Sequence, residues 1–198
     1  MHKQTPIRTL ILASSSPYRK ILLGRLGLEF LVQVPDVDET PLPAESAPAL
    51  AARLASAKAD AVARGNPVAV VIGSDQVALC EGAIVGKPGT AQLAERQLLS
   101  FSGKTVEFLS AVTVRCGETG FVFDRTVSTL VCFRDLNIEE IRRYIRLDEP
   151  LQCAGSFKSE AAGLTLLESM QSNDPSAIIG LPLIAVSQAL RQAGYAVP

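Results

Sequence analysis

The chain alternates between short apolar runs and amphipathic segments, a pattern that predicts a mixture of strands and helices. Residues 9–13 and 68–73 are apolar runs typical of buried strands. Residues 105–116 and 121–133 are rich in Val, Thr and Phe and flank a turn with two glycines, so they predict a β-hairpin. Because the strands of a hairpin run antiparallel, the sheet cannot be purely parallel, and we expect a mixed α/β fold.

Apolar residues recur at helical spacing between these runs. The predicted helices cover residues 17–26, 47–64, 90–100, 137–147 and 182–192. Gly27 and Gly194 follow two of them as stop signals, and Asn137 with Glu140 forms a capping-box pattern at the start of a third. Helices interspersed with strands therefore flank the predicted sheet.

Composition indicates one self-standing domain. With 198 residues, of which 47% are hydrophobic, the chain can bury roughly 70% of the surface that it exposes when unfolded. Residues 35–48 contain four prolines and several acidic residues, so they predict an exposed loop. No internal repeat or linker divides the sequence, and we expect a single domain over residues 1–198.

Charge and hydropathy limit the possible partners. The formal net charge is -1, so no overall positive field is present to hold nucleic acid by its phosphates. No apolar stretch is long enough to span a membrane, and the first apolar run is too short for a signal peptide. We therefore expect a soluble, cytoplasmic protein that binds neither nucleic acid nor membrane.

Cysteine and histidine usage excludes several kinds of catalysis. Cys80, Cys116, Cys132 and Cys153 are widely spaced and form no zinc-ligand pattern, so we expect reduced cysteines. The only histidine is His2, near the start of the chain. Catalytic triads and histidine bases need an imidazole, so catalysis here must depend on carboxylates, lysines, arginines, hydroxyls or a bound ion.

Polar residues follow both apolar runs, where open α/β sheets place their ligand crevices. Residues 14–16 are three serines before a helix that carries Arg19, a combination that suits a phosphate group but also an ordinary serine helix cap. Asp75 follows residues 68–73, where a buried carboxylate is unfavourable unless it binds hydrogen-bond donors, a metal or water. It is therefore either a functional residue or a turn aspartate.

Other charged residues are candidates by position. Lys58, at the edge of a helical apolar stripe, and Lys87, in a rigid Gly-Lys-Pro turn, are either phosphate-binding cations or ordinary solvated lysines. Glu39 is either a ligand or one of several solvated loop acids. Residues 153–160 combine small residues with Phe, Lys and Glu, as in a recognition loop or a plain glycine-containing turn.

Taken together, these motifs resemble the Maf-like family of nucleotide pyrophosphatases. The matching segments are LILASSSPYRKILL, PDVDET, the helix with Lys58, VIGSDQV, GKP, CAGSFKSE and IIGLPL, in this order. The subgroup acting on 7-methyl-GTP is marked by an aromatic residue after S-x-S-P, by S-D-Q and by A-G-S-F-K-S-E. Tyr18 stands where the wider family has the first arginine of S-x-S-P-R-R, which disfavours the pyrimidine triphosphate activity of the other branch.

The resemblance also implies roles for individual residues. It implies that Asp75 is the proton acceptor and that Asp75 and Glu39 assist a divalent metal, Mg²⁺ or Mn²⁺, since the available donors are oxygens. The implied substrate-binding residues are Ser14, Arg19, Glu39, Lys58 and Lys87, of which Glu39 assists metal or water and the others contact the triphosphate. The implied base-selecting residues are Tyr18, Gln76 and Glu160. The implied fold is a strongly twisted sheet resembling inosine triphosphate pyrophosphatase, with the cleft between two lobes, and a homodimer is a further expectation.

The expected activity is hydrolysis of 7-methyl-GTP to the nucleoside monophosphate and pyrophosphate. A 7-methylguanine ring is cationic, so an aromatic ring such as that of Tyr18 could stack on it with a gain of about 0.5 to 2 kcal/mol. Two alternatives remain open at this point. The chain could hydrolyse dTTP, UTP or another modified nucleotide instead, or it could be a non-catalytic nucleotide-binding protein that influences cell division.

Overall fold

One mixed sheet of seven strands runs through the structure, a computed structural model that describes residues 8–197. His2 lies outside the described residues. The strands are β1 (Leu10–Ala13), β2 (Leu31–Val32), β3 (Val70–Cys80), β4 (Ala83–Val85), β5 (Thr105–Cys116), β6 (Phe121–Phe133) and β7 (Leu167–Ser172). The α-helices are α1 (Pro17–Gly24), α2 (Ala47–Ala63), α3 (Ala91–Phe101), α4 (Ile138–Asp148) and α5 (Leu183–Gln192). Short 3-10 helices are η1 (Pro150–Gln152), η2 (Ala154–Ser156), η3 (Ala162–Leu166) and η4 (Ala177–Ile179).

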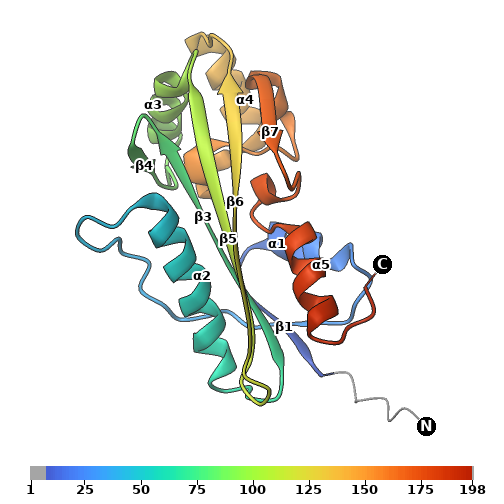
Figure 1. Ribbon diagram of the computed structural model, residues 1–198. Coiled ribbons are helices and arrows are strands. Elements are labelled where there is room, and N and C mark those ends of the chain that lie inside the picture. Colours follow the sequence, from blue (N-terminus) through green and yellow to red (C-terminus); the bar gives the residue numbers. More distant parts are fainter. Residues whose placement is uncertain (1–7, 198) are drawn as a thin grey trace.

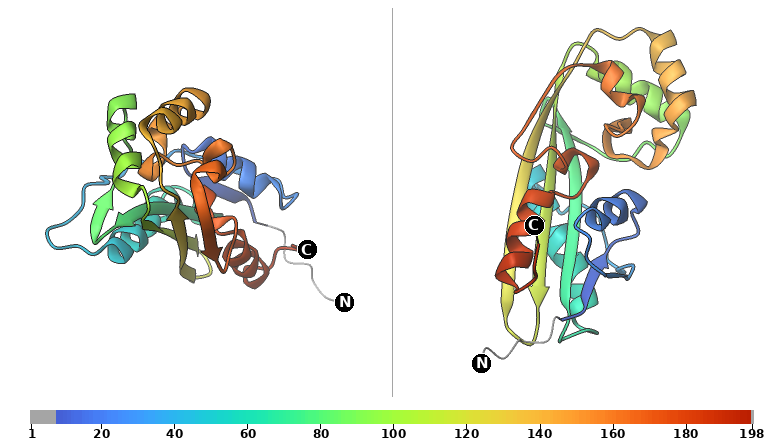
Figure 2. Two further views of the ribbon diagram at one scale, coloured as in Figure 1. Left: turned by 90° about the horizontal axis from the view of Figure 1, so that it is seen from above. Right: turned by 90° about the vertical axis from the view of Figure 1, so that its right-hand side faces the viewer.

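The strand order is β2-β1-β3-β5-β6-β7, and β4 pairs with β3 beside this path. β1 runs parallel to β2 and β3, whereas the pairings of β3, β5, β6 and β7 with one another are antiparallel. The long strands β3, β5 and β6 run the length of the molecule and twist along it (Figures 1 and 2). The predicted mixed α/β fold is therefore confirmed.

Helices cover both faces of the lower part of the sheet (Figure 1). Ile11 and Val71 pack with residues of α2, whereas Leu12 and Ile72 pack with residues of α1 and α5 on the opposite face. Both faces of β1 and of the first half of β3 are thus buried. This explains why their sequences are continuous apolar runs rather than alternating ones.

A second core lies in the upper lobe, between the far ends of the long strands and helices α3 and α4 (Figure 1). Its aromatic centre is Phe101, Phe108, Phe133 and Phe157, with ring centroids 5.4 to 5.8 Å apart in the contacting pairs. Tilted and edge-on rings at this spacing pack favourably. The same sheet therefore carries one core in each lobe and leaves the region between them open to a ligand.

Most predicted elements are confirmed, with one correction that bears on the site. The hairpin strands have the predicted bounds, and the capping box of Asn137 and Glu140 begins α4. The prediction that the strand ends at Gly73 is wrong, because β3 continues to Cys80 while paired with β5 throughout. The first helix ends at Gly24 rather than just before Gly27.

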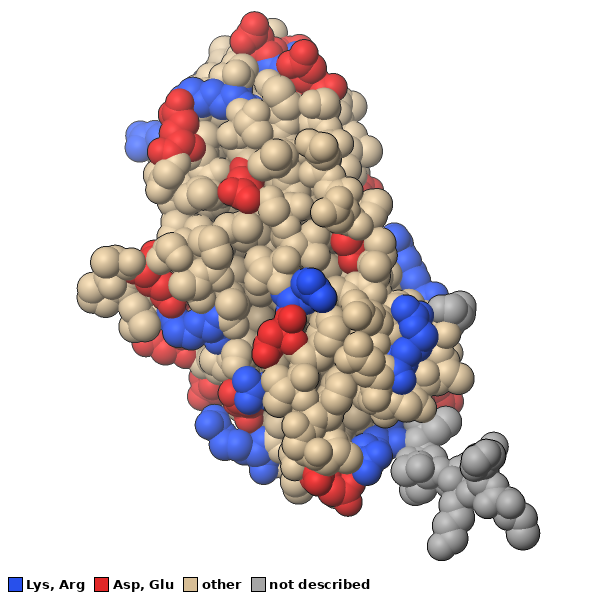
Figure 3. All heavy atoms as spheres, in the orientation of Figure 1, with Lys and Arg blue, Asp and Glu red and all other residues tan. Residues whose placement is uncertain are grey.

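Two further sequence expectations can be compared with the structure. The four cysteines named above are all free, as expected from their spacing. Among residues 8–197, no helix is long and apolar enough to cross a membrane. Lys, Arg, Asp and Glu are interspersed over the face drawn in Figure 3, without a continuous basic tract.

Candidate functional site

The sheet opens along one edge of β3, and this opening creates the site. β1 pairs with β3 at residues 70–73, and β4 pairs with it from Ala78 onward on the far side of the opening. Between these two pairings, residues 74–77 have only β5 as a neighbouring strand within the described chain. Asp75 and Gln76 therefore stand at an unpaired stretch of an otherwise central strand.

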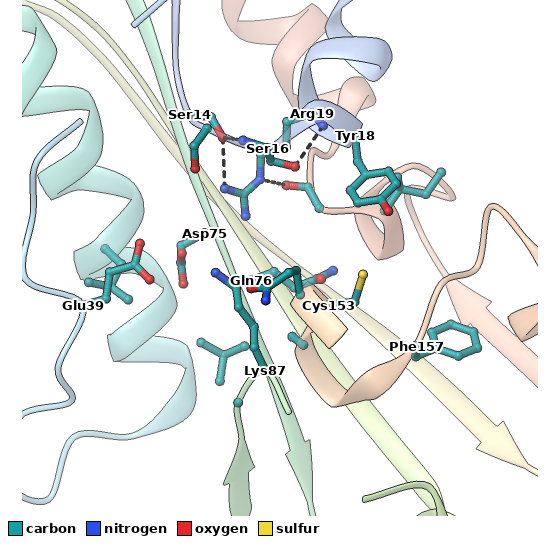
Figure 4. A pocket seen from close by; sticks show the side chains of 18 of the residues that line it. Ser14, Ser16, Tyr18, Arg19, Glu39, Asp75, Gln76, Lys87, Cys153 and Phe157 are labelled. Atoms are coloured by element: carbon teal, nitrogen blue, oxygen red, sulfur yellow. Dashed lines mark hydrogen bonds between the residues drawn. The ribbon is translucent and has the colours of Figure 1, made fainter. Parts of the chain in front are cut away.

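A cleft of about 780 Å³ lies at this opening. It is lined by every site residue that the sequence predicted, namely Ser14, Tyr18, Arg19, Glu39, Lys58, Asp75, Gln76, Lys87 and Glu160. Figure 4 labels Tyr18 and Arg19 of α1, Asp75 and Gln76 of β3, Glu39 of the loop before α2 and Lys87 of the turn after β4 around this cleft. The sequence motifs thus form one constellation, while the role of each residue stays a prediction at this stage.

The ammonium group of Lys58 links two carboxylates. Its Nζ lies 2.6 Å from Oδ1 of Asp75 and 2.5 Å from Oε1 of Glu39. The side chains of Lys58 and Asp75 are 8% and 10% exposed, whereas that of Glu39 is 49% exposed. Lys58 favours the charged carboxylate and holds the pKa of Glu39 below its ordinary value, although partial burial of Glu39 works to raise it.

Gly73 allows this ion pair to form. A Cβ atom at Gly73 would lie 2.3 Å from the Ala55 carbonyl oxygen and 2.5 Å from the Ala59 nitrogen, both in the backbone of α2. Only glycine therefore permits such a close approach of the helix to the strand. Because Lys58 lies on α2 and Asp75 on β3, this approach sets the distance between the two side chains.

Arg19 is held at the cleft by a carbonyl from the other end of the chain. Its Nε donates to the Gly180 carbonyl at 2.8 Å, and its Nη1 lies 3.5 Å from the Ser14 hydroxyl oxygen. The Ser74 hydroxyl lies 2.9 Å from the same Gly180 carbonyl. Burial lowers the pKa of Arg19, and the negative charges of Asp75 and Glu39 oppose that shift. A guanidinium stays charged in any case, so it adds a fixed positive charge.

Gln76 and Ser110 hold the segment that supplies this carbonyl. The Gln76 side-chain nitrogen lies 3.1 and 2.9 Å from the carbonyl oxygens of Ala177 and Ile178 and 3.0 Å from the Ser110 hydroxyl oxygen, and these three acceptors share its two hydrogens. The Ser110 hydroxyl in turn donates to the Ala177 carbonyl at 2.7 Å. These bonds fix η4 beside β3, at the point where Gln76 lines the cleft.

The loop that carries Glu39 is attached to α2 at a second point. Arg53 donates to both carboxylate oxygens of Glu45, at 2.6 and 2.8 Å, and to the Thr40 carbonyl at 3.0 Å. This bidentate contact lowers the pKa of Glu45 to about 2. The predicted exposed loop thus has two anchors on α2, Arg53 and Lys58.

One wall of the cleft combines the loop after α4 with Tyr18 of α1. Lys158 lies with its Nζ 5.7 Å from the centroid of the Tyr18 ring. Cys153, Phe157 and Glu160 line the same wall. Burial raises the pKa of the Cys153 thiol, so this cysteine is a weak nucleophile.

The donor set fits a cation that arrives with a polyphosphate. Asp75 and Glu39 converge on a single point, now held by the Lys58 ammonium, and both offer carboxylate oxygens. Within residues 8–197, no group of three or more His, Cys, Asp or Glu side chains could hold a metal by itself. Mg²⁺ commonly binds through one or two carboxylates together with substrate phosphates, so two acids are sufficient for it.

Several residues at the cleft were missed in the sequence. Gly180 and Ser110 act through a backbone carbonyl and a buried hydroxyl, neither of which has a pattern of its own. Lys158 and Cys153 fall within the suspected recognition loop, yet composition assigned no role to them. Glu149 lines the cleft in a left-handed conformation, with φ of 45°, which no helix-ending pattern indicated.

Comparisons with known proteins agree with this arrangement. A family model described as "Maf-like protein" matches residues 9–193. A protein of a Polaromonas species named "7-methyl-GTP pyrophosphatase" is 52% identical over 96% of this chain and 86% of its own length. Proteins of the same name from Aromatoleum aromaticum and Xanthomonas campestris are 53% and 52% identical, covering 96% of this chain and 97% and 98% of theirs.

Among solved structures, the Ham1 protein of Staphylococcus aureus matches 65% of this chain and 73% of its own, with a TM-score of 0.48 and 15% identity. This likeness is weak, and the fold class rests on the strand pairing described above. The family assignment rests instead on sequence similarity over nearly the whole chain. The chain belongs to the Maf-like family.

Proposed function

We propose that this chain is a nucleoside triphosphate pyrophosphatase that hydrolyses 7-methyl-GTP to 7-methyl-GMP and pyrophosphate. The observation that carries the proposal is the Asp75 carboxylate at the opening of the sheet, paired with Lys58 and facing a cleft that Arg19 and Lys87 also line. The names of relatives about 50% identical over nearly the full chain support the substrate. The chain is accordingly a hydrolase acting on a phosphoanhydride bond.

The charges at the lower end of the cleft suit a polyphosphate. Three cations, Arg19, Lys58 and Lys87, surround the two acids Asp75 and Glu39 there. Neither a hydrogen bond nor an ion pair engages the Lys87 ammonium within the described residues, so it can neutralise an incoming phosphate. Cations positioned in advance stabilise the charge that builds up on departing pyrophosphate.

Asp75 is the proposed general base. It is the most buried of the carboxylates that line the cleft, and Lys58 keeps its Oδ1 fixed. When triphosphate enters, phosphate oxygens compete for the Lys58 ammonium, which frees Asp75 to orient a water molecule and accept its proton. A positioned base of this kind contributes about 10² to 10⁴ in rate.

A divalent metal, Mg²⁺ or Mn²⁺, is part of the proposal, with Asp75 and Glu39 as its protein ligands. When bound, such an ion would supply charge neutralisation at the phosphates and acidify water. Activity is therefore expected to fall at least about 100-fold when EDTA removes divalent ions, and to return with Mg²⁺ or Mn²⁺. Pyrophosphate release measured in EDTA, with and without added metal, checks this, and full activity in EDTA would contradict it.

The base end of the cleft is proposed to select 7-methylguanine. Tyr18 offers a ring for stacking on a cationic base, Glu160 offers a carboxylate to the guanine N1 and N2 donors, and Gln76 offers its side-chain oxygen. Tyr18 and Glu160 are not among the residues proposed to bind the phosphates. Changing them should therefore alter the choice of base more than the reaction.

The combined variant Tyr18→Arg with Glu160→Gln is expected to lower the ratio of kcat/KM between 7-methyl-GTP and UTP by about 10-fold or more, because cation–π contact and charge pairing are both lost. A panel of 7-methyl-GTP, GTP, dTTP and UTP with pyrophosphate detection measures this ratio. Ser15→Ala, a small change at a cleft residue with no proposed role in base choice, is the control. An unchanged ratio in the double variant would remove the proposed base selection.

The same panel distinguishes the alternative substrates. Faster turnover of dTTP or UTP than of 7-methyl-GTP by the parent chain would indicate that pyrimidine nucleoside triphosphates are the substrates. Nucleotide binding without turnover would favour a non-catalytic role. The homodimer and the cytoplasmic location stay predictions.

A further inference from the structure

Lys158 connects the two lobes across the cleft, yet the proposed reaction gives it no role. Its ammonium donates to the carbonyl of Asp148, the last residue of α4 in the upper lobe. The same ammonium lies 5.7 Å from the ring centroid of Tyr18, in the first turn of α1 in the lower lobe. α4 lies in the upper lobe and α1 lies below it, beside α5 (Figure 1).

The groups in contact with the Lys158 ammonium, the Asp148 carbonyl and the Tyr18 side chain, are neutral, and the Asp148 carboxylate acts on it from a greater distance. Within the described residues Lys158 joins no ion pair, in contrast to Lys58, which contacts two carboxylates. Partial burial works to lower the pKa of Lys158, but contact with the Tyr18 side chain raises it, and the net shift is upward. Lys158 therefore stays charged, and a charged ammonium over a tyrosine ring is attractive.

The backbone of Lys158 is rigidly placed. Its N–H donates to the Tyr144 hydroxyl at 3.0 Å, and that hydroxyl donates to the Ser156 carbonyl at 3.2 Å. Gly163 packs directly against the backbone of Lys158, because a Cβ atom at Gly163 would lie 2.2 Å from the Lys158 carbonyl oxygen. The flexible lysine side chain is thus fixed at its origin by these contacts and at its end by Asp148 and Tyr18.

We propose that Lys158 is a positioning residue for base recognition, which holds the Tyr18 ring in place across the cleft. This inference rests on the proposed function, because the ring is the proposed stacking surface for 7-methylguanine. The half-buried Tyr18 side chain also contacts the Cys153 thiol, but the Lys158 ammonium is the charged group that lies over its ring, so loss of that charge should leave the ring less restrained. Ordering the ring before the nucleotide arrives reduces the entropy lost on binding, so affinity rises without a direct contact to the reacting phosphates.

The variant Lys158→Met keeps the length of the side chain and removes its charge. We expect the KM for 7-methyl-GTP to rise about 10-fold and kcat to change less than about threefold, because the phosphate end is untouched. Tripolyphosphate has no base, so its inhibition constant for the variant should stay within about twofold of that for the parent. Lys158→Arg should restore most of the affinity, because a guanidinium also stacks on a tyrosine ring.

Lys20→Met is the matched control, since Lys20 is an exposed lysine on α1 that does not line the cleft. It should leave KM and kcat unchanged. The inference would be overturned by an unchanged KM in Lys158→Met, or by an equal loss of tripolyphosphate binding, which would indicate general damage to the cleft.

A nucleotide-free measurement keeps this inference separate from the proposed function. The chain contains no tryptophan, so Tyr18→Trp introduces a single indole at the position in question. Adding Lys158→Met should raise the rate of fluorescence quenching by acrylamide about twofold, because the ring is released from its cation, whereas adding Lys20→Met should not. Equal quenching rates in the two double variants, Tyr18→Trp with Lys158→Met and Tyr18→Trp with Lys20→Met, would overturn the positioning role even if the parent hydrolyses 7-methyl-GTP. If the parent does not hydrolyse 7-methyl-GTP, the proposed function fails, and this quenching result still decides the contact.

Discussion

Asp75→Asn is expected to lower kcat for 7-methyl-GTP by roughly 10³-fold, while nucleotide binding stays within about threefold of the parent. Asparagine has almost the same shape as aspartate but cannot accept a proton from water at neutral pH. It also has no charge to pair with Lys58, which retains its contact with Glu39. Single-turnover kinetics give the rate, and equilibrium binding of the nucleotide without metal gives the affinity.

Asp60→Asn is the matched control for this variant. Asp60 also lies on α2, where it pairs with Arg115 at 2.8 Å, and it does not line the cleft. The kcat of the Asp60→Asn variant should stay within about twofold of the parent's kcat. If Asp75→Asn kept the parent's activity, Asp75 would not be the base.

Gly73→Ala is expected to lower the free energy of unfolding by about 3 kcal/mol or more, because the added methyl group meets backbone atoms of α2 that cannot rotate away. Part of the strain would be relieved by moving α2 away from β3. That movement would displace Lys58 from Asp75, so kcat should fall as well, since a displacement of about 1 Å can reduce rates about 100-fold. Urea denaturation and steady-state kinetics at one temperature measure both effects.

Gly24→Ala provides the comparison for Gly73→Ala. Gly24 is the last residue of α1, and a Cβ atom there would meet nothing within 4 Å. Alanine should be neutral there or stabilise the protein by up to about 1 kcal/mol. Equal stability of the two alanine variants would mean that α2 does not approach β3 as closely as described.

The elements that the sequence predicted well are those whose signals are local. The β5–β6 hairpin follows from two β-rich segments around a glycine-containing turn, and the start of α4 follows from the capping box of Asn137 and Glu140. Each signal involves residues close in sequence that satisfy one another's hydrogen bonds. At these elements the tertiary contacts favour the same structure as the local sequence, so the local signals were sufficient to predict it.

The prediction failed where tertiary contacts outweigh local pattern. The polar residues 74–76 indicated the end of a strand, but Ser74 lies buried inside β3, with its hydroxyl 2.7 Å from the Ala111 carbonyl. A neighbouring strand and η4 supply partners that the local sequence does not reveal. The edge strands β2, β4 and β7 were missed because their side chains are mostly exposed and lack an apolar pattern.

The candidate site was predictable in its residues but not in its geometry. The family resemblance brought together Asp75, Lys58 and Arg19 as one site, and the structure places all three along the same cleft. The link from Arg19 to Gly180 spans 161 positions, and that from Lys158 to Tyr18 also joins distant segments. No spacing rule in the sequence encodes such contacts, because only the tertiary fold brings these distant segments together.

The most direct test of the central claim is to identify the products of 7-methyl-GTP by ³¹P NMR during turnover by the parent chain with Mg²⁺. We expect 7-methyl-GMP and pyrophosphate in equal amounts, with no 7-methyl-GDP and no orthophosphate at early times. Release of orthophosphate with 7-methyl-GDP, or nucleotide that stays intact at enzyme concentrations sufficient for binding, would contradict it.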